Sequence, residues 1–163
     1  LVGSEMCIRD SLPTKDLVDM VQTRASGKVE VDELSWCTRK KVNEVKQSRS
    51  EKTYTIRFRA EGIDDEKKAE EAILSLSGQI INQETPKRVS HRRAAKTRRR
   101  KVTSIDNVSF EGDEIELTLR CEAGTYVKEL VHSDEGRTKP SVREVLDADC
   151  EVIWLDVLEI HDD

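Results

Sequence analysis

One segment, residues 114–131, changes its apolar periodicity halfway along, and this change limits the folds that the chain can adopt. The first half alternates, which predicts a strand with one buried face, and its apolar residues are Ile115, Leu117, Leu119 and Cys121. In the second half Val127, Leu130 and Val131 recur at helical spacing. Gly124 separates the two patterns and can adopt backbone angles that a β-carbon forbids. The segment therefore predicts a strand–turn–helix corner, with Thr125 as the helix N-cap.

The corner places an aromatic residue and a cation at the start of a helix. Tyr126 and Lys128 follow the turn directly. Free N–H groups at a helix start favour an anion such as phosphate. An ordinary structural corner with a surface lysine is the alternative, and these residues by themselves favour that alternative.

Charge is unevenly distributed along the chain. The net charge of −5 does not suggest a nucleic-acid partner. However, nine of the 28 basic residues lie between Pro86 and Lys101, where there is no acid. Such a band predicts binding of a polyanion with strong salt dependence, and a solvated loop is the alternative. The basic band consists of Lys87, Arg88, Arg92, Arg93, Lys96, Arg98, Arg99, Arg100 and Lys101.

Other residue types exclude several classes of protein. The four cysteines (Cys7, Cys37, Cys121 and Cys150) are far apart without a C-x-x-C pair, so neither a zinc site nor a disulfide framework is expected. This cysteine usage is typical of a reducing cytoplasm. No run of 18 apolar residues could span a membrane. Residues 1–11 fit no period and are interpreted as a non-native leader.

The remaining patterns predict helices and strands in mixed order. The helices expected are Thr14–Ala25, Thr38–Gln47, Asp64–Leu76, Thr125–His132 and Val142–Leu146, with N-caps at Thr14, Thr38 and Ser141. The strands expected are Lys28–Asp32, Lys52–Ala60, Gln79–Thr85, Val102–Phe110, Glu114–Glu122 and Glu151–Ile160. Buried positions are expected at Trp36, Cys37, Val42 and Val45, and the last strand is expected to be buried on both faces. This order predicts an α+β fold with a mixed, largely antiparallel sheet and flanking helices.

Few residues are candidates for chemistry on their own. His91 lies among arginines and is interpreted as an RNA contact or a surface residue rather than a base. Tyr54 lies in an alternating strand, where a core role is the usual one. Tyr54, Tyr126 and Lys128 become a candidate site only if the strand Lys52–Ala60 lies beside the corner.

Four blocks of the chain, in the same order, resemble one family. They are Gly27–Val31, Lys52–Tyr54, Thr85–Ala94, and Ala123–His132 followed by Gly136–Pro140. They resemble the C-terminal part of the archaeal and eukaryotic THUMP-bearing tRNA pseudouridine synthases that act on the T-loop. The resemblance covers most of residues 12–163 and implies that they form the C-terminal portion of the catalytic domain.

The resemblance implies a reaction and roles for matching residues. The family converts uridine to pseudouridine in tRNA, at T-loop positions 54 and 55, without a cofactor or a metal, and a monomeric cytoplasmic enzyme is expected. Tyr54 would pack against the target uracil, Tyr126 would help to form its pocket, and Lys128 would pair with the catalytic aspartate. Contacts to the tRNA are expected from Lys87, Arg88, His91, Arg92, Arg93, Arg98, Arg99, Arg100 and Lys101.

The sequence also departs from the family pattern. The catalytic aspartate of the family lies in a Gly-Arg-Glu-Asp-x-Asp-x-Arg block upstream of Tyr54, and the chain has no such block. The N-terminal RNA-binding domain of the family has no counterpart either, and Thr55 stands where the family has arginine. The expectation is a synthase fragment that is inactive alone. A non-catalytic RNA-binding module that uses the basic band is the alternative, and a protein-interaction domain is a weaker one.

Overall fold

The computed structural model describes residues 13–28 and 30–161, so the expected leader lies outside the described residues. The chain divides into two compact units, residues 1–48 and 49–163. The described residues include no helix that is long and apolar enough to cross a membrane.

The first unit contains two helices, α2 (Thr14–Ala25) and α3 (Arg39–Gln47). Thr38 caps α3 as predicted, because its Oγ1 accepts a hydrogen bond of 3.2 Å from the Lys41 N–H. The predicted cap at Thr14 is wrong: Pro13 is the N-cap residue of α2 and makes no side-chain cap bond. The strand predicted over Lys28–Asp32 is not found in the described residues. Lys28 and residues 30–32 are not in a strand, and Val29 lies outside the described residues.

Burial in the first unit is also lower than the sequence predicts. Trp36 is 58% exposed, Val45 is 64% exposed, and Val42 and Cys37 are exposed as well. The prediction that these side chains are buried is therefore wrong. The physical reason is that the described part of this unit contains no sheet and no buried side chain against which they could pack.

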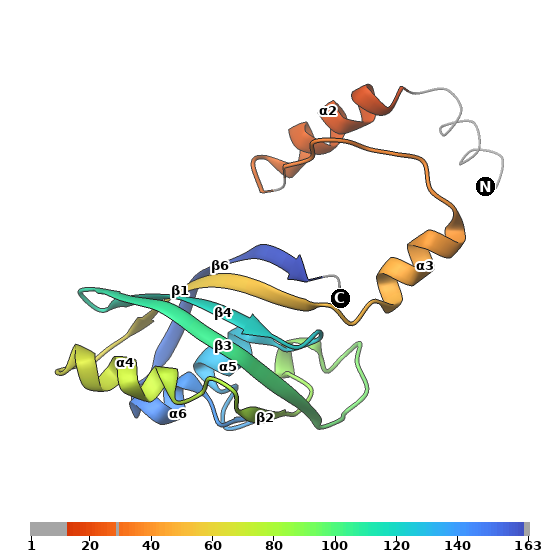
Figure 1. Ribbon diagram of the computed structural model, residues 1–163. Coiled ribbons are helices and arrows are strands. Elements are labelled where there is room, and N and C mark those ends of the chain that lie inside the picture. Colours follow the sequence, from red (N-terminus) through yellow and green to blue (C-terminus); the bar gives the residue numbers. More distant parts are fainter. Residues whose placement is uncertain (1–12, 29, 162–163) are drawn as a thin grey trace. The chain divides into compact units, whose positions relative to one another are not determined.

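The second unit is built on a six-stranded sheet with the order β5-β2-β3-β4-β1-β6, and all of its pairings are antiparallel (Figure 1). The strands are β1 (Glu51–Ala60), β2 (Ile80–Gln83), β3 (Arg98–Glu111), β4 (Glu114–Cys121), β5 (Thr138–Lys139) and β6 (Cys150–His161). The predicted α+β class is confirmed. The two-residue strand β5 was not predicted, and β3 begins inside the basic band rather than after it.

The alternation of β1 and β4 gives the sheet one apolar and one ionic face. Ile56 pairs with Leu117 and Phe58 with Ile115, and all four side chains are buried. On the opposite face the Arg57 guanidinium donates to Glu111, Glu114 and Glu116 at 3.0–3.2 Å. The basic outer face predicted for β1 is therefore neutralised by acids of the neighbouring hairpin.

Three helices cover the apolar face of the sheet (Figure 1). They are α4 (Glu66–Leu74), α5 (Val127–His132) and α6 (Val142–Leu146), and a 3-10 helix, η1 (Lys87–Val89), follows β2. Asp65 caps α4 by accepting from the Lys68 N–H at 3.1 Å. Ser141 caps α6 as predicted, accepting from the Glu144 N–H at 3.3 Å.

Strand β6 differs from its prediction. It lies at the edge of the sheet and pairs with β1. Val152 and Leu155 pack partly against the core, but Val157 is 55% exposed and Leu158 is 59% exposed. The prediction that this strand is buried on both faces is wrong: Val157 and Leu158 point to opposite faces of the sheet, and neither is covered.

Candidate functional site

The strand–turn–helix corner forms where it was predicted. Strand β4 ends at Cys121, and Gly124 has a φ of +78°, in the region that favours glycine. Thr125 does not cap the helix: its hydroxyl donates to the Glu122 carbonyl at 2.7 Å, which closes the turn, and Tyr126 is the N-cap residue of α5. The prediction of Thr125 as the N-cap is therefore wrong by one residue, because its hydroxyl is used in the turn.

Arg100 of β3 packs on this turn. Its Nη2 lies 3.4 Å from the place that a β-carbon on Gly124 would occupy. Its Nε is enclosed and has no hydrogen-bond partner among the described residues. Gly124 is thus required for its backbone angle, whereas a β-carbon there would make only ordinary van der Waals contact with the guanidinium.

Tyr126 is held by a residue that the sequence analysis did not single out. Gln83, at the end of β2, is completely buried. Its Oε1 accepts from the Tyr126 N–H at 2.9 Å, and its Nε2 donates to the Tyr126 carbonyl at 3.0 Å. The sequence does contain a sign of this role. Gln83 lies two residues after the buried Ile81, on the same face of the strand, where an apolar residue would be usual and a buried polar one needs a hydrogen-bond partner.

Two cations of the basic band lie near the ring of Tyr126. The Arg88 and Arg98 guanidinium carbons lie 5.9 Å and 6.0 Å from the ring centroid. Arg88 also donates to both carboxylate oxygens of Glu129, at 2.6 Å and 3.2 Å. The Glu129 side chain is 2% exposed, and no sequence pattern indicated that this acid is buried. The ion pair raises the pKa of Arg88, so its charge is permanent.

The strand that contains Tyr54 lies beside the corner, which is the condition for a joint site with Tyr126 and Lys128. Strand β1 pairs with β4, the strand that leads into the corner, and Tyr54 lies opposite Leu119. Burial, followed by the neighbouring Cys121, raises the pKa of the Tyr54 phenol. Lys128 is exposed in the first turn of α5 and makes no ion pair with a carboxylate among the described residues. Tyr54 thus presents a neutral, half-buried ring, and Lys128 an exposed cation.

The basic band divides between two faces of β3. Arg98 lies over Tyr126 and Arg100 over Gly124, on the same face. Arg99 and Lys101 alternate with them and are exposed. Because successive side chains of a strand point to opposite faces, the four consecutive cations cannot all lie on one surface.

Acids distant in sequence neutralise part of the band. Lys87 pairs with Glu135, Arg88 with Glu129, and Arg100 approaches Glu122 at 3.9 Å. Four members of the predicted RNA-binding set are exposed and form no ion pair with a carboxylate of the described residues: His91, Arg92, Arg93 and Arg99. These four and Lys101 are the residues most open to an anionic partner.

The two buried cysteines, Cys121 and Cys150, are not reactive thiolates. Burial raises the pKa of Cys121 to about 11 and that of Cys150 to about 12, so both remain thiols at neutral pH. No cluster of three potential metal ligands occurs in the described part of the chain.

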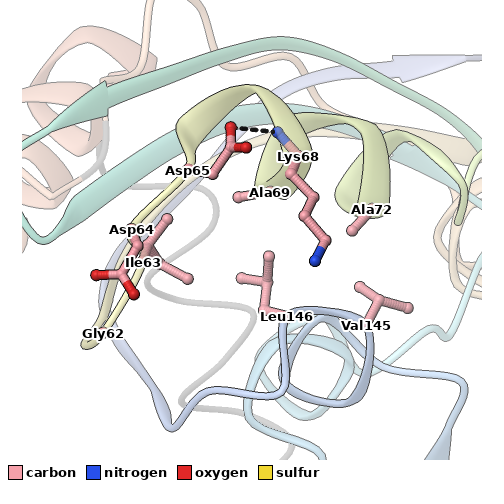
Figure 2. Close-up of a pocket in the computed structure, with 9 residues that line it drawn as sticks. All are labelled: Gly62, Ile63, Asp64, Asp65, Lys68, Ala69, Ala72, Val145 and Leu146. Carbon is pink, nitrogen blue, oxygen red and sulfur yellow. Dashed lines mark hydrogen bonds between the residues drawn. The ribbon is translucent and has the colours of Figure 1, made fainter.

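A separate pocket of about 230 Å³ lies between the start of α4 and α6 (Figure 2). Figure 2 shows an apolar lining that includes Ile63, Val145 and Leu146, with Asp65 making its capping bond to Lys68. None of the predicted site residues lines this pocket. The corner and the pocket are therefore distinct features.

Known structures share this fold. A chain in the crystal structure of a Cbf5-Nop10-Gar1 complex is 24% identical, with a TM-score of 0.56, over 69% of this chain and 31% of that one. A chain in the structure of an H/ACA RNP bound to a substrate RNA containing 2'-deoxyuridine is 18% identical, with a TM-score of 0.54, over 91% of this chain and 44% of that one. At these identities the likeness shows the fold alone.

The family follows from the sequence comparisons. Residues 5–161 match the family described as Pus10, C-terminal, and the chain belongs to this family. A relative from Methanothrix thermoacetophila, named tRNA pseudouridine synthase Pus10, is 43% identical over 93% of this chain and 33% of its own length. A relative of the same name from Thermofilum pendens is 37% identical over 93% of this chain and 35% of its own length. The chain thus spans about a third of the curated relatives that it matches.

Proposed function

We propose that this chain is the C-terminal part of a tRNA pseudouridine synthase catalytic domain, whose targets are the T-loop uridines 54 and 55. The observation that carries the proposal is the family match over residues 5–161, together with relatives named tRNA pseudouridine synthase Pus10. A cytoplasmic location and a monomeric full-length enzyme belong to the same proposal.

The reaction is an isomerisation without net redox change. The N1–C1′ bond of uridine breaks, a C5–C1′ bond forms, the C5 proton leaves to solvent and N1 gains a proton. No oxidant or reductant enters this balance. The target base must leave its stack, which costs a few kcal/mol and has to be offset by contacts in the pocket.

The proposed roles follow the corner. Tyr54 packs against the uracil ring, which is consistent with its half-buried neutral phenol. Tyr126 borders the uridine pocket, and Lys128 pairs with the catalytic aspartate, for which its exposed ammonium is free of a carboxylate in the described residues. The exposed cations Arg92, Arg93, Arg99 and Lys101, with His91, contact the tRNA backbone.

Pseudouridine formation on unmodified tRNA tests the proposal. The chain alone should give no product, because no aspartate occupies the motif of the family. A longer protein that joins the chain to the upstream segment of its relatives should release tritium from tRNA labelled at uridine C5. Turnover by the isolated chain would contradict the assignment of the nucleophile. Salt-sensitive tRNA binding without turnover by the longer protein would favour the non-catalytic RNA-binding module.

A further inference from the structure

We infer that Gln83 is a positioning residue for the proposed reaction: its buried amide fixes the peptide of Tyr126, and so directs the Tyr126 ring and the Lys128 side chain. This inference rests on the proposed function. It concerns a residue outside the basic band and outside the motif that contains the corner.

Both the oxygen and the nitrogen of the Gln83 amide are used in this role. Its oxygen accepts from the Tyr126 N–H, and its nitrogen donates to the Tyr126 carbonyl at 3.0 Å and to Thr138 Oγ1 at 3.3 Å. The two contacts to Tyr126 require opposite ends of the amide, since a reversed amide would set N–H against N–H. The network therefore determines a single orientation of the side chain.

The backbone of Tyr126 suits this pairing. With φ −87° and ψ 90° it is extended, so its N–H and carbonyl point to the same side. An extended residue presents both groups to a neighbouring strand in this manner. Gln83 thus takes the place of a neighbouring strand for Tyr126, the residue at which the chain passes from the turn into α5.

The start of α5 has no side-chain cap bond of its own, although Val127 in its first turn is buried in the core. The helix has six residues. Gln83 reaches it from a position 43 residues earlier in the chain. Because Lys128 lies in the first turn of this helix, a rotation at Tyr126 displaces both side chains. A misplacement of about 1 Å can reduce an enzymatic rate about a hundredfold.

The test uses the longer protein that contains this chain, a tRNA transcript, and separate measurements of single-turnover rate and tRNA Kd. Gln83→Met removes both bonds to Tyr126 with little change in volume. Gln83→Glu keeps the acceptor but sets a carboxylate against the Tyr126 carbonyl, and it carries the test if the Met variant does not fold. Each should lower the rate by about 10- to 100-fold and leave Kd within about twofold.

Thr138→Val is the matched control, because it removes the third bond of the same amide and leaves the pairing with Tyr126 intact. Its rate should stay within about threefold of the wild type. The inference would be overturned if both Gln83 variants reacted at the wild-type rate, or if they lost only affinity for tRNA. It would also be overturned if Thr138→Val lowered the single-turnover rate as much as the Gln83 variants do. A wild-type protein that converts no uridine would contradict the proposed function itself, and the role of Gln83 with it.

Discussion

At the scale of single residues, Tyr126 is restrained at both its backbone and its ring. Gln83 pairs with its peptide, and Arg88 and Arg98 lie about equally far from its ring, at 5.9 Å and 6.0 Å. A guanidinium at this distance attracts a tyrosine ring by about 0.5–1 kcal/mol at exposed sites. Glu129 neutralises Arg88, which lowers the repulsion between the two cations. The ring is therefore held in place before any ligand binds.

Substitutions at Tyr54 and Lys128 separate catalysis from binding. In the longer protein, Lys128→Ala should lower turnover by about 10²–10³-fold, the usual effect of removing one electrostatic stabiliser, and Tyr54→Ala should also lower turnover more than tRNA affinity. Steady-state kinetics and tRNA titrations measure the two effects. Lys68→Ala, which removes an exposed lysine from the first turn of α4, is the control and should be silent. A change in affinity alone would show that the assigned roles are wrong.

At the scale of elements, one ion pair joins η1 to α5. Arg88 of η1 and Glu129 of α5 are 41 residues apart in sequence. The exposure of the pair is unequal, since the side chain of Arg88 is 53% exposed and that of Glu129 is 2% exposed. The cost of breaking the pair therefore depends on which partner is removed.

Arg88→Ala should destabilise the protein more than Glu129→Gln. The first leaves a buried carboxylate unpaired and should cost about 2–4 kcal/mol, somewhat below the 3–5 kcal/mol of a fully buried pair, because Arg88 is half in solvent. The second leaves a solvated guanidinium and should cost about 1 kcal/mol. Urea unfolding followed by circular dichroism measures both. Lys87→Ala, from the exposed pair with Glu135, should change stability by less than about 0.5 kcal/mol, and the reverse order of Arg88 and Glu129 would contradict the account.

At the scale of the whole sheet unit, ionic residues occur in two different settings. On the outer face of β1 the arginines are matched: Arg57 contacts three glutamates, and Arg59 contacts Asp113 and Glu114. In the basic band Arg92 and Arg93 are exposed without a carboxylate partner among the described residues. A cation that has no carboxylate partner can contact a phosphate, and release a counterion condensed on the nucleic acid, without first breaking an ion pair.

The salt dependence of tRNA binding should distinguish these settings. Changing Arg92 and Arg93 together to Gln should reduce the magnitude of the slope of log K against log salt by roughly 1.4–1.8 for two lost phosphate contacts. Changing Arg57 and Arg59 to Gln should leave the slope unchanged, because their charge is already neutralised. Filter binding between 50 and 300 mM salt (roughly the range where such effects are large) measures both. Binding that does not respond to salt would instead favour a protein partner for the band.

Local pattern alone determined much of this protein. The alternation of β1 and β4 predicted their buried faces, the change of period at Gly124 predicted the corner, and Ser141 predicted the start of α6. Each of these depends on residues within a few positions of one another, where backbone geometry and side-chain spacing decide the outcome.

The tertiary structure decided what those elements meet. Gln83 and Tyr126 are 43 residues apart, and Arg88 and Glu129 are 41 apart, so no local spacing indicates either contact. The exposure of β6 and the partial neutralisation of the basic band have the same origin. The sequence by itself therefore established the corner and its candidate residues, whereas the packing of distant segments established which cations remain open and which buried amide holds Tyr126, because both depend on the path of the chain through space.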